Sequence, residues 1–204
     1  MQVFIENILE PHLQEAVVAV LNDEAVFQCG KQTAGQFAQR VKHNQQANPD
    51  DTEVKGAVAL IEKALLANSV FSAAAVPKRF AKLFFNRYQQ GESYGFHVDN
   101  PVIVNTRTDL SFTLFLSEPS AYEGGELVLR LPSGDEEIKL PKGSLALYPS
   151  HCVHKVNEVT SGCRLAAVGW VESRVRRADQ REILFDLEAR SGFQRLRVLP
   201  FDPQ

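Results

Sequence analysis

The chain has 204 residues, 44% of them hydrophobic, and a formal net charge of -3 from 22 basic and 25 acidic side chains. These values are ordinary for a single globular domain and give no electrostatic footprint for nucleic acid or an anionic membrane, so neither is expected as a partner. The start MQVFIENILEPHLQE lacks the pattern of a secretory signal, and no apolar run approaches the roughly 20 residues of a membrane span, which predicts a cytoplasmic protein.

Two amphipathic helices are predicted in the first 79 residues. The first begins behind Pro11, which suits a first helical turn, and shows apolar residues at helical spacing up to Leu21. The second follows Asp51 and Thr52, either of which can cap exposed amides, and repeats the same spacing up to Leu65. The polar stretch between them is weakly periodic and is interpreted as loop with short structure of undetermined type. Residues 1–79 are therefore predicted to be a helical support region.

From Phe80 the chain changes to short runs of β-branched, aromatic and leucine residues separated by turn residues, the pattern of a compact all-β unit. Eight such runs without helices between them favour an antiparallel jelly roll. The predicted strands lie near residues 80–88, 95–102, 110–116, 126–131, 136–140, 144–148, 154–159 and 163–171, within a β-helix core at 80–173.

Helical character returns after Trp170, so residues 174–204 are predicted to form a carboxyl-terminal helix and tail. Acidic residues are interleaved with the arginines of this segment, which favours a solvated helix face over a nucleic-acid surface. The predicted fold is thus mainly β with flanking helices (α+β), in one domain covering residues 1–204.

The stretch ESYGFHVDNP, residues 92–101, contains a candidate pair of metal ligands. In a strand, side chains two residues apart point to the same face, so His97 and Asp99 are expected to project together. Alone this pattern is a weak signal, because a half-exposed strand with ordinary polar residues gives the same sequence.

A third candidate ligand lies in LYPSHCVHKVNEV. His154 begins an alternating strand and is the better candidate, whereas His151 follows Pro149 and Ser150 in a predicted turn, where it would be a loop side chain near the mouth of the site. Two histidines and one carboxylate leave coordination positions open, as in non-haem Fe(II) oxygenases. A bidentate 2-oxo acid and dioxygen can occupy those positions.

Arg164 is the predicted partner for the distal carboxylate of such a 2-oxo acid. Arginine offers two-pronged, charge-assisted hydrogen bonds, and this one stands ten residues after His154 in an apolar strand, where an unpaired charge is costly. The alternative is an outward-facing strand arginine in water.

Four stretches carry a family resemblance: FNRYQQGESYGFHVDNP, TDLSFTLFLSEPSAYEGGELVL, LPKGSLALYPSHCVHKVNEVTSGCRLAAVGWVES and RRADQREILFDLE. They resemble the Fe(II)/2-oxoglutarate-dependent dioxygenases, in the prolyl-4-hydroxylase-like branch. The chain as a whole, including TAGQFAQRVKHNQQ near its start, is similar to the bacterial PKHD-type hydroxylases.

This resemblance implies a double-stranded β-helix (jelly roll) with amino-terminal helices packed on it. It also implies Fe(II) held by His97, Asp99 and His154, 2-oxoglutarate bound through Arg164, and O2 and L-ascorbate as further requirements. By the same analogy, Tyr88 on the preceding strand donates a hydrogen bond to 2-oxoglutarate.

Several neighbouring residues are interpreted less specifically. Tyr94 is a second tyrosine expected near the iron, toward substrate. For both Tyr88 and Tyr94 the alternative is core packing with a satisfied hydroxyl, and Trp170 is assigned to packing. Gly169 stands where bulkier residues are usual in relatives, and the tail FQRLRVLPFDPQ looks short or divergent. These departures put substrate specificity and any oligomer contact in doubt, rather than the reaction type.

The predicted function is that of an Fe(II)- and 2-oxoglutarate-dependent dioxygenase, which hydroxylates an unidentified small-molecule or peptide substrate while 2-oxoglutarate becomes succinate and CO2. The alternative is a cupin-like metal-binding module or metal-dependent isomerase that does not use 2-oxoglutarate, and Arg164 discriminates between the two. A nucleic-acid demethylating dioxygenase is disfavoured by the net negative charge. The oligomeric state is left open, with a homodimer as one option.

Overall fold

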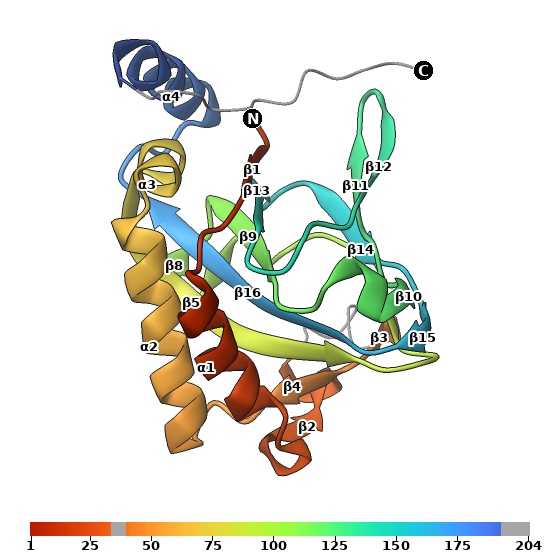
Figure 1. The fold of residues 1–204 in the computed structure, drawn as a ribbon. Coiled ribbons are helices and arrows are strands. Elements are labelled where there is room, and N and C mark those ends of the chain that lie inside the picture. The colour runs from red at the N-terminus through yellow and green to blue at the C-terminus, as the bar shows by residue number, and fades with distance from the viewer. Residues whose placement is uncertain (34–39, 193–204) are drawn as a thin grey trace.

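The computed structural model describes residues 1–33 and 40–192, in which helices cover one face of a pair of antiparallel sheets (Figure 1). The larger sheet has the order β1 (Val3–Ile5), β13 (Leu145–Pro149), β9 (Leu110–Phe115), β16 (Arg164–Ser173), β5 (Pro77–Tyr88), β4 (Gln45–Ala47) and β2 (Phe27–Cys29). The smaller has the order β12 (Gly134–Ile138), β11 (Leu127–Leu131), β14 (Val153–Val156), β6 (Ser93–His97) and β3 (Lys42–His43).

Two short ribbons complete the strands. They pair β10 (Tyr122–Gly124) with β15 (Val159–Gly162), and β7 (Val102–Ile103) with β8 (Thr106–Arg107). A cluster of buried side chains from both sheets, among them Phe115, Tyr148 and Leu129, packs them face to face. The eight predicted strands correspond to β5, β6, β9, β11, β12, β13, β14 and β16, and the predicted jelly roll with flanking helices is confirmed.

The helices are α1 (Pro11–Leu21), α2 (Thr52–Ala67), α3 (Ser69–Ala75) and α4 (Ala178–Gly192), with short 3-10 helices at Glu24–Val26, Gly30–Thr33 and Pro119–Ala121. As predicted, Pro11 stands in the first turn of α1. The carboxylate of Asp51 caps α2 by accepting hydrogen bonds from the amides of Glu53 and Val54, at 2.8 and 3.0 Å.

Alternation along the central strands separates the two faces of the larger sheet. Leu83 and Phe85 of β5 pack into the core with α1, α2 and α3, together with Leu110, Phe112 and Leu114 of β9. The intervening residues of both strands face the other sheet and line a cavity between the two. The helices therefore support the sheet from behind, and the chemistry-bearing side chains lie on the face away from them.

Two expectations are corrected. Residues 1–79 are not helical support alone: β1, β2 and β4 join the larger sheet and β3 the smaller, because short segments there pair with strands distant in sequence. The strand expected over 95–102 ends at His97, where the chain turns away. The stretch between the first two helices, expected to be loop with short structure, contains the short strands β3 and β4.

Two points remain: which stretches singled out in the sequence lie outside the described residues, and whether a helix could cross a membrane. The tail at 193–204, and part of the stretch TAGQFAQRVKHNQQ, lie outside the described residues. Of the helices in the described ranges, no single one has the length and apolar content to cross a membrane; α2 and α3 reach them only as a pair, bent by 83°.

Candidate active site

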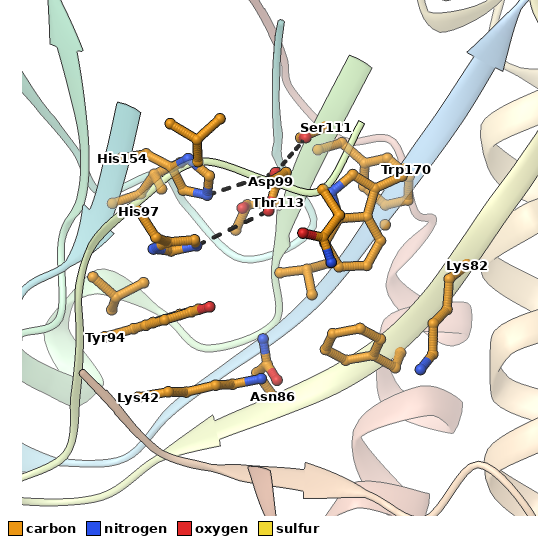
Figure 2. Close-up of a pocket in the computed structure, with 18 of the residues that line it drawn as sticks. Lys42, Lys82, Asn86, Tyr94, His97, Asp99, Ser111, Thr113, His154 and Trp170 are labelled. Carbon is orange, nitrogen blue, oxygen red and sulfur yellow. Dashed lines mark hydrogen bonds and ion pairs between the residues drawn. The ribbon is translucent and has the colours of Figure 1, made fainter. Parts of the chain in front are cut away.

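His97, Asp99 and His154 converge at one end of the cavity, where Figure 2 shows both imidazoles turned toward the carboxylate. The Nε2 atom of His97 lies 4.0 Å from Oδ1 of Asp99, and Nε2 of His154 lies 3.7 Å from Oδ2. One ligand atom from each residue lies within 4.8 Å of the other two, and all three side chains are buried. This is a spacing at which one metal ion can be shared.

Strand pairing places the two histidines, and a hydrogen bond places the aspartate. His97 on β6 is directly opposite His154 on β14 in the antiparallel register. Asp99 lies past the end of β6, and its Oδ2 accepts a hydrogen bond of 2.6 Å from the hydroxyl of Ser111 on β9. Ser111 thus orients the carboxylate from the opposite sheet, a role that strand alternation did not predict.

Both imidazoles are oriented through their other ring nitrogen. Nδ1 of His97 lies 2.8 Å from the carbonyl oxygen of Gly95, and Nδ1 of His154 lies 3.0 Å from that of Cys152. A proton on each Nδ1 satisfies these contacts and leaves the Nε2 lone pairs for a metal. Burial, and next the neighbouring His154, lower the pKa of His97, which favours the neutral, ligating form.

Aromatic rings hold the histidines in place. The ring of Tyr94 stacks on that of His97, with centroids 3.6 Å apart and planes within 16°, and Tyr148 meets His154 edge-on at 5.2 Å. Tyr94 therefore packs against His97, and it also lines the cavity.

Arg164 and Tyr88 lie opposite each other on β16 and β5 and line the same cavity as the histidines and Asp99. Arg164 is 1% exposed, and its Nε and Nη2 atoms have no hydrogen-bond partner among the described residues. Its guanidinium lies over the rings of Tyr88 and Phe115, at 5.3 and 5.4 Å. The water-exposed alternative for Arg164 is wrong, because the side chain is buried. Its guanidinium has lost contact with water without a counterion among the described residues, which is costly.

The cavity that joins these groups has a volume of about 690 Å³. Beyond the residues already named, its wall includes Phe84 and the four residues Lys42, Lys82, Asn86 and Trp170, which are labelled in Figure 2. Its rim includes the exposed side chains of Val98, Val102 and Val104. A space of this size can hold a small co-substrate together with part of a second molecule.

The site residues predicted from sequence are brought together: His97, Asp99, His154, Arg164 and Tyr88 all line this cavity. His151 is exposed, outside the three-residue cluster, and lines a separate cavity near α4.

Sequence reasoning missed Ser111, Lys82, Lys42 and Tyr122. Lys82 had a usable signal, because it shares strand parity with Tyr88, whereas no residue in the strand of Ser111 was predicted to face the site. Tyr122, whose buried hydroxyl has no partner among the described residues, and Lys42 lie in short segments that gave no such signal.

Comparisons with known proteins agree with this geometry. Residues 83–172 match the model of the 2OG-Fe(II) oxygenase superfamily. A PKHD-type hydroxylase of Parvibaculum lavamentivorans is 49% identical over 168 residues, 82% of this chain and 76% of the relative. One of Picosynechococcus sp. is 45% identical over 184 residues, 90% of this chain and 84% of the relative.

Solved structures show the same fold at lower identity. A Pseudomonas putida prolyl-4-hydroxylase is 21% identical with a TM-score of 0.61, over 85% of this chain and 93% of that one. A Trichoplax adhaerens prolyl hydroxylase, solved with a fragment of hypoxia inducible factor, is 15% identical with a TM-score of 0.63, over 90% of this chain and 86% of that one.

Fold and site together define an Fe(II)- and 2-oxoglutarate-dependent dioxygenase, an enzyme whose cofactor is Fe(II) and whose co-substrates are 2-oxoglutarate and O2. The chain belongs to the PKHD-type hydroxylases. The alternative of a cupin-like module that does not use 2-oxoglutarate is thereby set aside.

Proposed function

We propose that His97, Asp99 and His154 hold Fe(II), and that Arg164 and Tyr88 hold 2-oxoglutarate, in an enzyme that hydroxylates a C–H bond of a small molecule or peptide. The donor set supports the first part, since two neutral imidazoles and one carboxylate suit non-haem Fe(II). The three side chains are at most 9% exposed, which limits their contact with bulk water.

Arg164 is the observation that carries the 2-oxoglutarate assignment. Two of its nitrogen atoms are buried and have no hydrogen-bond partner within residues 1–33 and 40–192, and the residue lines the same cavity as the proposed iron ligands. A buried cation in this position calls for an anion, and a carboxylate matches the two-pronged geometry of a guanidinium. The distal carboxylate of 2-oxoglutarate supplies that anion.

Tyr88 is suited to donate a second hydrogen bond. Burial raises the pKa of its phenol to about 12, against a weaker opposing effect of Arg164, so the hydroxyl keeps its proton at neutral pH. Ser111 keeps Asp99 oriented while the imidazoles are held by backbone carbonyls. When bound, iron and 2-oxoglutarate supply the oxidising chemistry, in which O2 is consumed, succinate and CO2 form, and a C–H bond becomes C–OH.

Prolyl hydroxylation would rest on likeness to the two solved hydroxylases, which shows the fold alone, so the proposed substrate class stays at a small molecule or peptide. A cytoplasmic location, a role for L-ascorbate, the absence of nucleic-acid and membrane partners, and the homodimer option stay predictions. The same holds for the single-domain boundaries.

Succinate formation from 2-oxoglutarate with Fe(II), together with calorimetric binding of 2-oxoglutarate to the Mn(II)-loaded protein, tests this proposal. We expect Asp99→Ala to lose metal binding, and Arg164→Met to keep metal binding while 2-oxoglutarate affinity falls at least tenfold. Arg177→Met removes an exposed guanidinium near α4 and is the matched control. Unchanged 2-oxoglutarate affinity in Arg164→Met, with metal still bound, would contradict the assignment.

A further inference from the structure

The cavity extends well past the groups proposed to hold 2-oxoglutarate. Lys82, Phe84 and Tyr88 face it from alternate positions of β5, and in the register with β16 Tyr88 is opposite Arg164 while Lys82 is opposite Trp170. Six residues of strand separate the two ends, roughly 20 Å at the usual rise per residue. A five-carbon acid held at Arg164 does not reach Lys82, so the Lys82 end is available to the prime substrate.

The cavity wall carries an excess of positive charge. Among its described residues are three cationic side chains, Lys42, Lys82 and Arg164, and one carboxylate, that of Asp99. Fe(II) and 2-oxoglutarate carry equal and opposite charges, so loading the site as proposed above leaves this excess in place. A substrate that enters the loaded cavity therefore meets a positive field, which favours an anion.

The two lysines converge on one aromatic ring. The ammonium nitrogens of Lys42 and Lys82 lie 5.7 and 5.3 Å from the ring centroid of Phe84. Lys42 is 3% exposed, and burial, followed by the like charge of Lys82, lowers its pKa to about 8. The ring face offsets part of the cost of bringing the two cations together, and an anionic group near both would offset more.

Polar atoms without partners occur in the same wall. Nε1 of Trp170 and the side-chain oxygen of Asn86 are buried, and neither has a hydrogen-bond partner among the described residues. The indole of Trp170 packs against Phe84, with ring centroids 5.5 Å apart, so an apolar surface lies beside this unused donor. Such a wall suits a ligand that has both an apolar body and a polar head.

We propose that the end of the cavity between Lys42 and Lys82 binds an anionic group of the prime substrate, a carboxylate or a phosphate, while the apolar part of the substrate lies against Phe84 and Trp170. This inference rests on the proposed function, because it assumes that 2-oxoglutarate occupies the Arg164 end. It makes the two lysines specificity-determining residues for the hydroxylation.

The single tryptophan of the chain gives a direct binding signal, because Trp170 is in the proposed subsite. Its fluorescence is titrated in the Mn(II)- and 2-oxoglutarate-loaded protein with phenylacetate, phenyl phosphate and the neutral phenylacetamide. We expect one or both anions to bind at least tenfold more tightly than the amide, since a charge-assisted hydrogen bond of this kind accounts for about that factor. The tighter of the two anions identifies the head group as carboxylate or phosphate.

Two lysine variants assign the preference to this subsite. Lys82→Met and Lys42→Met are each expected to weaken binding of the preferred anion roughly tenfold, with little change for phenylacetamide. Lys82 is only partly buried, so its variant keeps the test available if the replacement of Lys42 disturbs folding. Lys63→Met removes an exposed ammonium group from α2 and should leave the preference intact.

Equal affinity for anions and amide in the parent protein would overturn the proposal, as would an anion preference that survives both lysine variants. It would also be overturned if the lysine variants lost 2-oxoglutarate affinity as strongly as probe affinity, because the lysines would then serve the co-substrate. Binding of 2-oxoglutarate to the Mn(II)-loaded parent protein is measured by calorimetry, which does not depend on the fluorescence of Trp170. If 2-oxoglutarate does not bind in that measurement, the proposed function itself is contradicted.

Discussion

The ring and the hydroxyl of Tyr88 have different roles. The buried ring packs against the guanidinium of Arg164, whereas the hydroxyl is proposed to donate a hydrogen bond to 2-oxoglutarate. Tyr88→Phe should therefore keep the fold and weaken 2-oxoglutarate binding by roughly five- to tenfold, the effect of losing one hydrogen bond to a charged group. Calorimetry on the Mn(II)-loaded variant measures this loss. Mn(II) affinity without 2-oxoglutarate is the internal control, and equal 2-oxoglutarate affinity in variant and parent would refute the assignment.

Lys42 links the stability of the metal-free protein to pH. Its pKa is about 8 in the folded protein and about 10.5, the ordinary value for lysine, in the unfolded chain. Between pH 8 and pH 10.5 the unfolded chain therefore binds more protons than the folded protein, so the free energy of unfolding rises with pH. Between pH 7.5 and 9.5, the free energy of unfolding of the parent should rise by about 2 kcal/mol relative to that of Lys42→Met.

Urea unfolding at several pH values measures this difference. Lys82 and Asp99, which also act on Lys42, are present in both proteins, and Lys63→Met on the surface of α2 is the control for removing an ammonium group. Parallel curves for the parent and Lys42→Met would show that burial does not depress the pKa of Lys42.

The site residues that sequence analysis predicted are those whose chemistry is unusual for their surroundings. Arg164 is a charge in an apolar strand, and His154 was preferred over His151 because it begins an alternating run. Lys42 gave no such signal: it belongs to a two-residue strand whose position depends on pairing with Tyr94, far along the chain. Long-range pairing of this kind leaves no local pattern.

At the scale of elements, the predictions that held were those with local signals. The Pro11 start of α1 and the Asp51 cap of α2 depend on neighbouring residues only, and the long strands β5 and β16 show sustained apolar patterns. The seven-residue helix α3 was missed because its mainly apolar sequence has no clear period, although Asn68 caps it through the amide of Phe71.

The pairing of β9 with β16 depends on the absence of a side chain at Gly169. A Cβ atom there would lie 2.5 Å from Cζ of Phe112, which is buried against α3, and 2.9 Å from the carbonyl oxygen of Lys82. Gly169→Ala should therefore lower the free energy of unfolding by about 1–3 kcal/mol, as overpacking of a rigid core does. This close approach explains why the strand carries glycine where bulkier residues were expected.

Gly56 is the matched control, because it lies within α2 and a Cβ atom there would meet nothing within 4 Å. Gly56→Ala should raise stability by about 0.5–1 kcal/mol, through helix propensity and reduced freedom of the unfolded chain. Denaturant unfolding of the two variants gives both values. If Gly169→Ala were as stable as the parent, the packing of Phe112 would be looser than the structure shows.

For the whole molecule, the helices stabilise one face of the larger sheet and leave the other face to build a cavity around charged groups. Within the part of the chain that the structure describes, the guanidinium of Arg164 is buried without a counterion, and binding of a dianion removes that cost. Stability and ligand binding should accordingly be coupled through Arg164.

Thermal unfolding with and without ligands tests this coupling. A ligand present at a hundredfold its dissociation constant adds about 2.7 kcal/mol to the free energy of unfolding. At such a concentration, 2-oxoglutarate should raise the Tm of the Mn(II)-loaded protein by roughly 5–10 °C. Asp99→Ala should lose the Mn(II)-dependent shift. Arg164→Met should keep the Mn(II) shift and, at the same concentration, lose at least half of the 2-oxoglutarate shift. Without ligands it should be about 1–4 kcal/mol more stable than the parent, because it replaces an uncompensated buried charge with an apolar side chain. A ligand-free Arg164→Met less stable than the parent would mean that the guanidinium contributes to the fold itself rather than to binding.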